Sequence, residues 1–363
     1  MNGPGPVDGP PLPLFSLRFD ESDRQAADAV LESGWITSGP RVAEFETEFG
    51  RALGADHVVA LSSCTAALHL ALAIFDVGPG DEVIVPALTF VAAANMVVAR
   101  GAGPVFADVV SLEEPNLDPR SVERVLTERT RAVVPVHYAG YRCRMGELRD
   151  VVEEADVVVI EDSAHACITQ TDAGACGTLS EAGAFSFFSN KNLAIGEGGA
   201  LVVRDEDRAT RARLLRSHGM THQTLDRHRG HAYSYDVTEA GFNYRWDELR
   251  AAVGTQRLNR LPQALERRSA LAREYRVRLR EAAPGVTIPF SSDTESVPAH
   301  IFPILLPPGT GRDPVMSHMR ERGIQTSSHY PLIPAFEGYR PDPIGEWKVT
   351  TEYCERVVTL PFY

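Results

Sequence analysis

The sequence predicts an α/β protein with a mainly parallel sheet and helices on both of its faces. Between about residues 40 and 205, short apolar runs alternate with stretches of helical character, which is typical of βαβ units. The expected strands lie within residues 57–63, 81–88, 103–109, 131–140, 156–164, 183–189 and 199–205. Ligands of such open sheets bind at the carboxyl ends of the strands, so the residues that follow these runs are candidates for a site.

The chain length and a change of pattern near residue 250 indicate a second domain. A chain of 363 residues is longer than one core usually supports. We interpret residues 1–14 as a disordered lead-in, 15–250 as the large domain and 251–363 as a smaller α+β domain. A long helix from Trp246 to about Glu281, with a break or kink at Pro262, is expected to bridge them. Strands at 285–290, 300–307 and 326–331, a helix at 313–322 and an apolar end at 357–362 follow.

The composition is that of a globular protein with an excess of acidic residues. The chain has 36 Lys and Arg against 49 Asp and Glu, which gives a formal net charge of −13. This charge repels nucleic acid phosphates and anionic membranes, so neither is expected as a partner. The basic cluster at residues 227–231 has two open interpretations, a solvated loop or a clamp for substrate phosphates.

Cysteine spacing and the N-terminal segment bear on the cell compartment. The five cysteines are an odd number without a CxxC pair, so neither a disulfide framework nor a zinc site is expected. The first 15 residues lack positive charge and a long apolar core, which is unlike a signal peptide, and no later apolar run reaches membrane-spanning length. A cytoplasmic protein without a metal is therefore expected.

A strand that ends in small polar residues and passes directly into a helix spans residues 61–69. Such a junction points backbone N–H groups and the positive end of the helix dipole at one place, where a phosphate group would bind. The hydroxyl of Thr65 could add a donor. The alternative is ordinary N-capping of the helix by Ser or Thr, which is common.

The apolar run at 157–160 delivers two acids, Glu161 and Asp162, at its carboxyl end, and His165 follows three residues after the second. A carboxylate in this place can keep a ring nitrogen protonated, which pyridoxal chemistry requires of its electron sink. The alternatives are that one of the acids caps the next turn and that His165 is a buried histidine with satisfied hydrogen bonds.

Lys191 follows the aromatic-rich run at 184–188 and precedes the glycine-rich segment 196–199. A lysine at the mouth of an apolar site is the residue type that forms a Schiff base, because partial burial lowers its pKa and leaves a neutral amine. Taken alone, the segment also fits a surface lysine after a strand.

Phe90 follows the run at 81–87 and could stack on a flat heterocycle at the same sheet edge, although a lone Phe is more often part of a core. A phosphate site, an aromatic ring, an acid and a lysine thus occur in sequence at successive strand ends. Together they would surround one planar phosphorylated ring.

At these residues the sequence resembles the DegT/StrS family of sugar aminotransferases over roughly residues 30 to 360. The resemblance is carried by the segments 34–46, 62–72, 80–95, 103–109, 134–140, 161–166, 185–192, 196–202, 216–220 and 241–254. It implies the type I aminotransferase fold, pyridoxal 5'-phosphate as cofactor and a homodimer with a shared active site.

The resemblance also implies roles for the residues around the cofactor. Lys191 would bind it covalently, Asp162 would pair with the pyridine nitrogen, His165 would lie beside the ring hydroxyl, and Phe90 would stack on the ring. Two positions depart from the commonest pattern: Cys64 stands where the family often has glycine, and His165 where many members have glutamine. Both remain compatible with the chemistry, because backbone amides meet the phosphate and a histidine can also donate to the ring oxygen.

Further assignments concern the phosphate and the substrate. Thr65, Ala66 and Ser186 would hold the phosphate, and Asn243 would reach it from the other subunit. His329 and Tyr330 resemble the family's C-terminal segment near the substrate.

The function that the resemblance implies is transamination of a keto sugar, most simply a nucleotide-linked 3- or 4-keto sugar, with glutamate as donor. A keto-cyclitol substrate stays open, and a basic pocket that holds a diphosphate, including Arg227, Arg229 or Arg245, would distinguish the two. A cofactor-binding regulator without turnover is disfavoured by the presence of Lys191, Asp162 and Ser186. A nicotinamide-dependent oxidoreductase is disfavoured because no GxGxxG stands at a first strand-to-helix turn.

Overall fold

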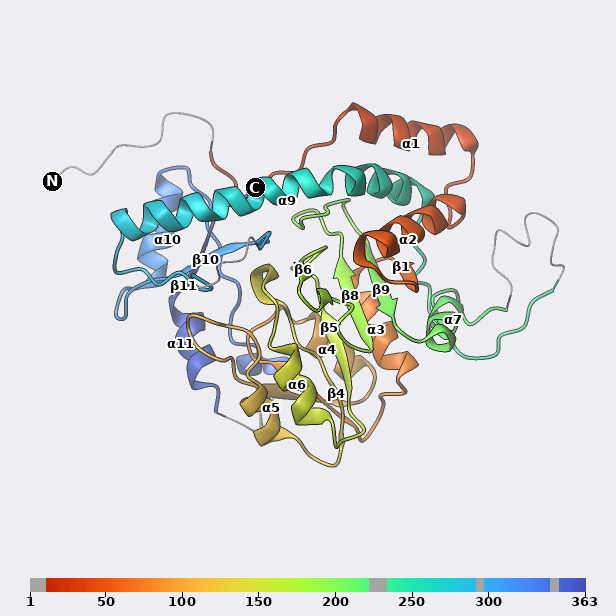
Figure 1. Cartoon of the computed structure of the whole chain (residues 1–363), viewed down its shortest axis with the longest axis horizontal. Helices are drawn as coiled ribbons and strands as arrows, with labels where there is room; N and C mark the ends of the chain where they lie inside the picture. Colours follow the sequence, from red (N-terminus) through yellow and green to blue (C-terminus); the bar gives the residue numbers. More distant parts are fainter. Residues whose placement is uncertain (1–10, 222–233, 292–296, 340–345) are drawn as a thin grey trace.

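The computed structural model describes residues 11–221, 234–291, 297–339 and 346–363 (Figure 1). Its centre is a seven-stranded sheet in the order β1-β9-β8-β5-β4-β2-β3. Neighbouring strands are parallel except that β9 runs antiparallel to both β1 and β8. The strands are β1 Val58–Leu61, β2 Glu82–Pro86, β3 Gly103–Ala107, β4 Thr130–Val133, β5 Val158–Asp162, β8 Ala182–Ser186 and β9 Gly199–Val203. The predicted mainly parallel α/β fold is confirmed.

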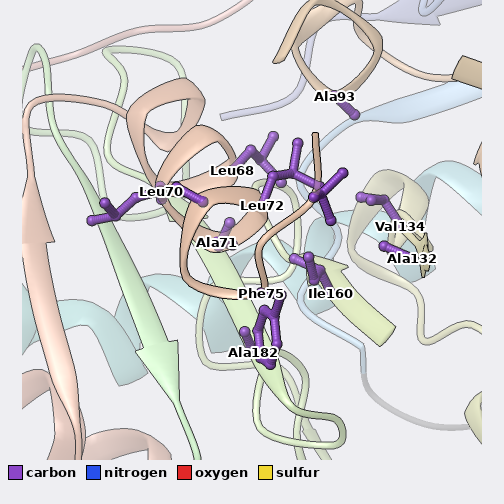
Figure 2. Packing of buried hydrophobic residues seen from close by; sticks show 14 of the residues in the cluster. Leu68, Leu70, Ala71, Leu72, Phe75, Ala93, Ala132, Val134, Ile160 and Ala182 are labelled. Atoms are coloured by element: carbon purple, nitrogen blue, oxygen red, sulfur yellow. The ribbon is translucent and has the colours of Figure 1, made fainter. Parts of the chain in front are cut away.

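Helices cover both faces of this sheet because alternate side chains along each strand point in opposite directions. In β9, Leu201 and Val203 pack into the cluster around α3, whereas Ala200 and Val202 pack toward α2 and α9. Figure 2 shows the first layer, in which leucines of α3 lie against sheet residues such as Ile160. The helices of this part are α1 Glu21–Ser33, α2 Pro40–Leu53, α3 Cys64–Ile74, α4 Ala92–Ala99, α5 Pro119–Val125, α6 Met145–Val152 and α7 Glu206–Leu215.

The helix ends follow local capping chemistry. Asp20 and Asp23 form a reciprocal capping box at the start of α1, and Gly34 ends the helix in the left-handed conformation with φ of 71°. Pro40 occupies the first position of α2, where a missing N–H costs no hydrogen bond. Short elements complete this part: the hairpin of β6 Gln170–Thr171 with β7 Gly174–Ala175, and the 3₁₀ turn η1 Tyr138–Gly140.

Helix α9, Glu248–Ala282, runs across the upper part of the molecule in Figure 1, with α1 above its right-hand end, and connects the two parts of the molecule. Of the break or kink expected at Pro262, the break does not occur, because the helix continues through this residue. Leu261 and Leu265 pack with α2 and the main sheet, whereas Ala272 packs in the C-terminal core. The change of core therefore falls within the helix, beyond the boundary expected at residue 250.

The C-terminal part has its own apolar core around a two-stranded antiparallel sheet. Its elements are β10 Phe302–Leu305, β11 Val357–Leu360, α10 Arg312–Glu321, α11 Lys348–Arg356, η2 Ile333–Ala335 and η3 Glu337–Tyr339. The strands expected at 285–290 and 326–331 are wrong, because each segment makes only an isolated bridge, Thr287 to Leu305 and Ser327 to Thr359.

Residues 11–14, which we expected to belong to a disordered lead-in, contact the C-terminal part. Leu12 forms a parallel bridge with Ile324, and its carbonyl accepts a hydrogen bond from the Gln325 amide at 2.9 Å. The Leu14 amide donates to the Gln325 side chain at 2.9 Å. The lead-in assignment is corrected at these four residues, because the backbone of the segment pairs with a strand-like edge. No helix in the described ranges has both the length and the apolar character needed to cross a membrane.

Candidate active site

A cavity of about 370 Å³ opens at the carboxyl ends of the central strands, where the sequence predicted a site. Loops after β1, β2, β5 and β8 meet there with a segment of the C-terminal part. Its lining residues are Ser63, Cys64, Thr65, Leu68, Thr89, Phe90, Ala92, Val136, Asp162, Ala164, His165, Ser186, Phe188, Asn190, Lys191, Glu197, Gly198, His329 and Tyr330. Eight of the residues nominated from the sequence thus lie around one cavity: Thr65, Phe90, Asp162, His165, Ser186, Lys191, His329 and Tyr330.

Lys191 lies in the tight turn that follows β8, and its amide donates to the Phe188 carbonyl at 2.9 Å. Burial lowers the pKa of Lys191 to about 8, although the charge of Asp162 acts in the opposite direction. At neutral pH an appreciable fraction of the amine is therefore unprotonated and able to attack an aldehyde. Its Nζ lies 3.4 Å from His300 Nε2.

Asp162 ends β5 on the face that α3 covers, because it has the same parity as Ile160. Burial raises the pKa of Asp162 above its ordinary value, while the Ala164 amide, which donates at 3.0 Å, acts to lower it. A buried carboxylate with so few donors is stabilised when a cation binds beside it.

Glu161 points to the other side of the sheet and has a structural role. It accepts hydrogen bonds from the amides of Gly177 and Leu179, both at 2.7 Å, and from the Ser180 hydroxyl at 2.9 Å. His137 Nε2 lies 2.8 Å away, and since His137 Nδ1 accepts from the Cys143 amide, Nε2 carries the proton and donates. The alternation of the strand thus separates the two acids that the sequence placed together.

His165 is held in one tautomer by its neighbours. Its Nδ1 accepts from the Ala139 amide at 3.3 Å, so in the neutral ring Nε2 carries the proton. Nε2 lies 3.0 Å from the Tyr330 hydroxyl. Burial, with the charges of Lys191 and His329, holds the pKa of His165 well below its usual range. The residue is therefore a neutral hydrogen-bond donor on the cavity wall.

The N-terminus of α3 faces the cavity, but one of its expected donors is already used. The Ser63 hydroxyl caps the helix by accepting from the Ala66 amide at 3.1 Å. The capping interpretation is confirmed for Ser63, and the amides of Cys64 and Thr65, which precede the first intrahelical bond, lie in the first turn of the helix. Ala66 is not among the residues that line the cavity.

Phe90 and Tyr330 form an aromatic rim. Phe90 is 56% exposed, and its ring centroid lies 6.0 Å from that of Tyr330. Phe90 is therefore not a core residue, and the alternative that it packs in the core is wrong. His329 is anchored by a 2.9 Å contact between its Nδ1 and the Thr359 hydroxyl.

Comparison with known proteins places this geometry in a family. The model of the DegT/DnrJ/EryC1/StrS aminotransferase family matches residues 18–363. The chain belongs to this family. It is 37% identical to the spore coat polysaccharide biosynthesis protein SpsC of Bacillus subtilis strain 168, covering 97% of this chain and 92% of that protein. It is 34% identical to the UDP-4-amino-4-deoxy-L-arabinose–oxoglutarate aminotransferase of Shewanella sediminis, covering 97% and 93%.

Solved structures of aminotransferases share the fold. DesV of S. venezuelae is 35% identical with a TM-score of 0.88, covering 98% of this chain and 94% of DesV. The PLP form of the putative sugar aminotransferase Spr1654 of Streptococcus pneumoniae is 26% identical with a TM-score of 0.89, covering 97% and 94%. The chain is therefore a PLP-dependent aminotransferase with the type I fold, as the sequence predicted.

The cavity of this aminotransferase fits pyridoxal phosphate. A partly neutral lysine, a buried carboxylate in need of a cation, a neutral histidine donor and amides at a helix N-terminus all border one space. Within the described ranges no group of His, Cys, Asp or Glu could hold a metal ion, and all five cysteines are buried and free.

Some nominated residues lie elsewhere. Asn243 is exposed, pairs with Ser217 through an isolated bridge and does not line the cavity. Arg245 donates to the Ser217 hydroxyl at 3.1 Å, also away from the cavity lining. Arg227 and Arg229 lie outside the described residues, so the basic cluster keeps both of its interpretations.

Other residues at the site were not found from the sequence. Glu197 lines the cavity, and His300 contacts Lys191 from the C-terminal part. For Glu197, the one sequence feature that could have indicated a role is its position inside the glycine-rich segment 196–199. His300 precedes an ordinary apolar strand, and no sequence feature indicated that it would contact the site.

Proposed function

We propose that this aminotransferase converts a nucleotide-linked 3- or 4-keto sugar to an amino sugar, with glutamate as the amino donor. The observation that carries the proposal is the position of Lys191, which has a pKa of about 8 and shares one cavity with buried Asp162. The relatives support the sugar class, because one is named for polysaccharide biosynthesis and another for a UDP-linked amino sugar.

Pyridoxal phosphate bound to Lys191 would supply the electron sink for proton removal at the carbon that carries nitrogen. Lys191, once freed by the donor, would take that proton and later return it to the product. Asp162 would hold the pyridine nitrogen in its protonated form, which in turn would return the carboxylate to its ionised state. His165 would donate from Nε2 to the ring oxygen.

The remaining walls would orient the cofactor and the substrate. Phe90 would stack on the ring, Thr65 and Ser186 would bind the phosphate, and His329 with Tyr330 would face the substrate. Since Ser63 already holds the Ala66 amide, we assign the phosphate to the amides of Cys64 and Thr65 rather than to Ala66.

A keto-cyclitol is the second candidate substrate, and the cavity wall is the observation that favours it. Among the described lining residues Lys191 is the one Lys or Arg, so this wall offers no arginine to a diphosphate. A nucleotide-linked substrate would depend on residues such as Arg227 and Arg229 or on a partner subunit. Comparing turnover of nucleotide-linked keto sugars with that of keto-cyclitols discriminates the two.

We further propose a homodimer in which Asn243 completes the phosphate site of the partner subunit. The exposed position of Asn243, away from the cavity of its own chain, supports this arrangement.

The test of the proposed chemistry uses an unusual feature of the sequence, which contains only two lysines, Lys191 and Lys348. Lys348 is exposed and pairs with Glu346 at 2.7 Å. Wild type with pyridoxal phosphate should give a visible absorption band that glutamate replaces with one at shorter wavelength. Lys191→Ala should lack the band, and the control Lys348→Arg should match wild type.

Borohydride reduction followed by peptide mapping fixes the assignment. The cofactor should remain on the peptide that contains Lys191. Labelling of Lys348 alone, or a band in Lys191→Ala, would refute the role of Lys191. A normal band that ignores glutamate would refute the donor only.

A further inference from the structure

His300 contacts the side chain of Lys191 and belongs to the C-terminal part of the chain. Its Nε2 lies 3.4 Å from Lys191 Nζ, and its side chain is 3% exposed. Among the described residues, His300 is the one hydrogen-bonding partner of the Lys191 amine. It joins the loop after β8 to the segment that precedes β10.

Several hydrogen bonds fix the position of His300. Its amide donates to the Ala139 carbonyl at 2.7 Å, and its own carbonyl accepts from Arg268 at 2.5 Å. The Asn192 side chain donates to the Pro298 carbonyl at 3.0 Å, which ties the lysine loop to the same segment. The separation of the two side chains is therefore set by backbone contacts on both sides.

The surroundings of His300 keep its ring neutral. Its ring centroid lies 4.4 Å from that of His165. Burial lowers the pKa of His300 well below its usual range, and the charges of Lys191 and Arg268 act in the same direction. A neutral imidazole has one donor nitrogen and one acceptor nitrogen, so the tautomer decides what His300 offers to Lys191.

A second, small cavity borders His300. It measures about 20 Å³, and His300, Asn190 and His329 are among its lining residues. Within the described chain, His300 Nδ1 and Asn190 Oδ1 are buried without a hydrogen-bond partner. The other walls are mainly apolar, with Leu14, Phe15, Ile301, Leu360 and Phe362 among them. A space above about 10–15 Å³ can hold one water molecule where it offers polar partners, and His300 and Asn190 are such partners here.

We propose that His300 is a positioning residue for Lys191: it carries its proton on Nδ1, donates it to a water molecule in the small cavity, and accepts a hydrogen bond from the lysine amine at Nε2. This leaves the lone pair of the neutral amine free and directs it away from His300. The opposite tautomer would donate from Nε2 and occupy that lone pair. The inference rests on the proposed role of Lys191.

The tautomer is tested without cofactor. In apoprotein carrying ¹⁵N-labelled histidine, the NMR signals of His300, assigned by their loss in His300→Gln, should show a protonated Nδ1 and an unprotonated Nε2 near pH 7.5. A protonated Nε2 would overturn the proposal.

The effect on Lys191 is tested by the rate at which the apoprotein captures pyridoxal phosphate as a function of pH. Wild type should show a midpoint near 8, the pKa of Lys191. An acceptor stabilises the ammonium form, so His300→Phe should move the midpoint to lower pH. Its limiting rate constant should fall about tenfold because the amine loses its orientation.

His300→Gln is the matched control, since its side-chain oxygen can replace the Nε2 acceptor. It should recover most of the limiting rate and return the midpoint toward 8. A wild-type profile for His300→Phe, or a Gln variant no better than Phe although both melt as wild type does, would overturn the proposal. If wild type itself captures no cofactor, the assigned role of Lys191 fails instead, while the tautomer experiment still reports on His300.

Discussion

At the scale of single residues, Asp162 and Glu161 show how one position along a strand changes the function of a carboxylate. Asp162 faces the cavity and has a raised pKa because burial disfavours its charge. Glu161 is buried too, but hydrogen bonds from His137, Gly177 and Ser180 overcome the effect of burial, and its pKa is lowered. The ionised Asp162 carboxylate therefore lowers the stability of the fold, whereas the ionised Glu161 carboxylate raises it.

Asp162→Asn should impair catalysis without weakening the apoprotein. The folded state binds more protons than the unfolded chain between pH 3.8 and the raised pKa of Asp162, so stability falls as the pH rises through that window. Removing the charge should therefore leave the Tm of the apoprotein at pH 7 equal to or above that of wild type. Turnover should fall about 100-fold or more with the loss of the charge beside the ring nitrogen. Calorimetry and steady-state kinetics measure both, and a lower Tm would contradict the assignment.

Glu161→Gln should have the opposite profile. Its new amide would face groups that donate, so the free energy of unfolding should fall by about 2–4 kcal/mol. Because the pKa of Glu161 is lowered, its contribution is present above pH 4.5 and is lost as the pH falls through the folded-state pKa. Urea unfolding at pH 7 and at pH 4 should show the difference from wild type shrinking in acid.

Sequence patterns could locate the acid and the lysine because each follows an apolar run at a strand end. The alternation of β5 also separates the roles of Asp162 and Glu161, once the face covered by α3 is known. His300 could not be predicted, because its contact with Lys191 joins segments 109 residues apart and depends on how the C-terminal part packs.

At the scale of elements, the start of α3 is positioned by a close approach of β9. A Cβ atom at Gly199 would lie 2.4 Å from the Cys64 nitrogen and from the Ser63 carbonyl carbon, both backbone atoms that cannot rotate away. The amides proposed to bind phosphate are thus fixed by the absence of a side chain on the neighbouring strand.

Gly199→Ala should therefore destabilise the protein and weaken cofactor binding together. The overpacking should cost about 1–3 kcal/mol and displace the first turn of α3. Gly146→Ala is the control, because Gly146 lies in α6 with no atom within 4 Å of an added Cβ, and it should stabilise by about 0.5–1 kcal/mol. Unfolding curves measure the change in stability of each variant, and a pyridoxal phosphate titration measures its affinity for the cofactor. Unchanged cofactor affinity in Gly199→Ala would contradict the role given to α3.

The strands expected from the sequence form where the apolar runs lie within the main sheet, and two of those expected in the C-terminal part fail because each pairs at one position only. Each expected strand of the main sheet is present, whereas 285–290 and 326–331 form isolated bridges only. Helix α9 passes through Pro262 because packing of Leu261 and Leu265 outweighs the lost hydrogen bond.

At the scale of the whole molecule, the site combines two distant parts of the chain. The main sheet supplies Asp162 and Lys191, and the C-terminal part supplies His329 and Tyr330. Helix α9 belongs to both cores, so its length sets where the C-terminal part meets the sheet. The change of pattern near residue 250 predicts a boundary, but the point within α9 at which one core gives way to the other depends on tertiary packing.

A shared site predicts that two defective variants repair each other. If Asn243 serves the partner's cavity, a heterodimer of Lys191→Ala with Asn243→Ala has one site that lacks both residues and one that is intact. Random reassortment of equal amounts gives half heterodimers, hence about a quarter of the sites intact. Mixed and refolded variants should then reach about 25% of wild-type activity, above the mean of the two homodimers. If each chain used its own Asn243, every site in the mixture would stay defective, and activity would not exceed that mean.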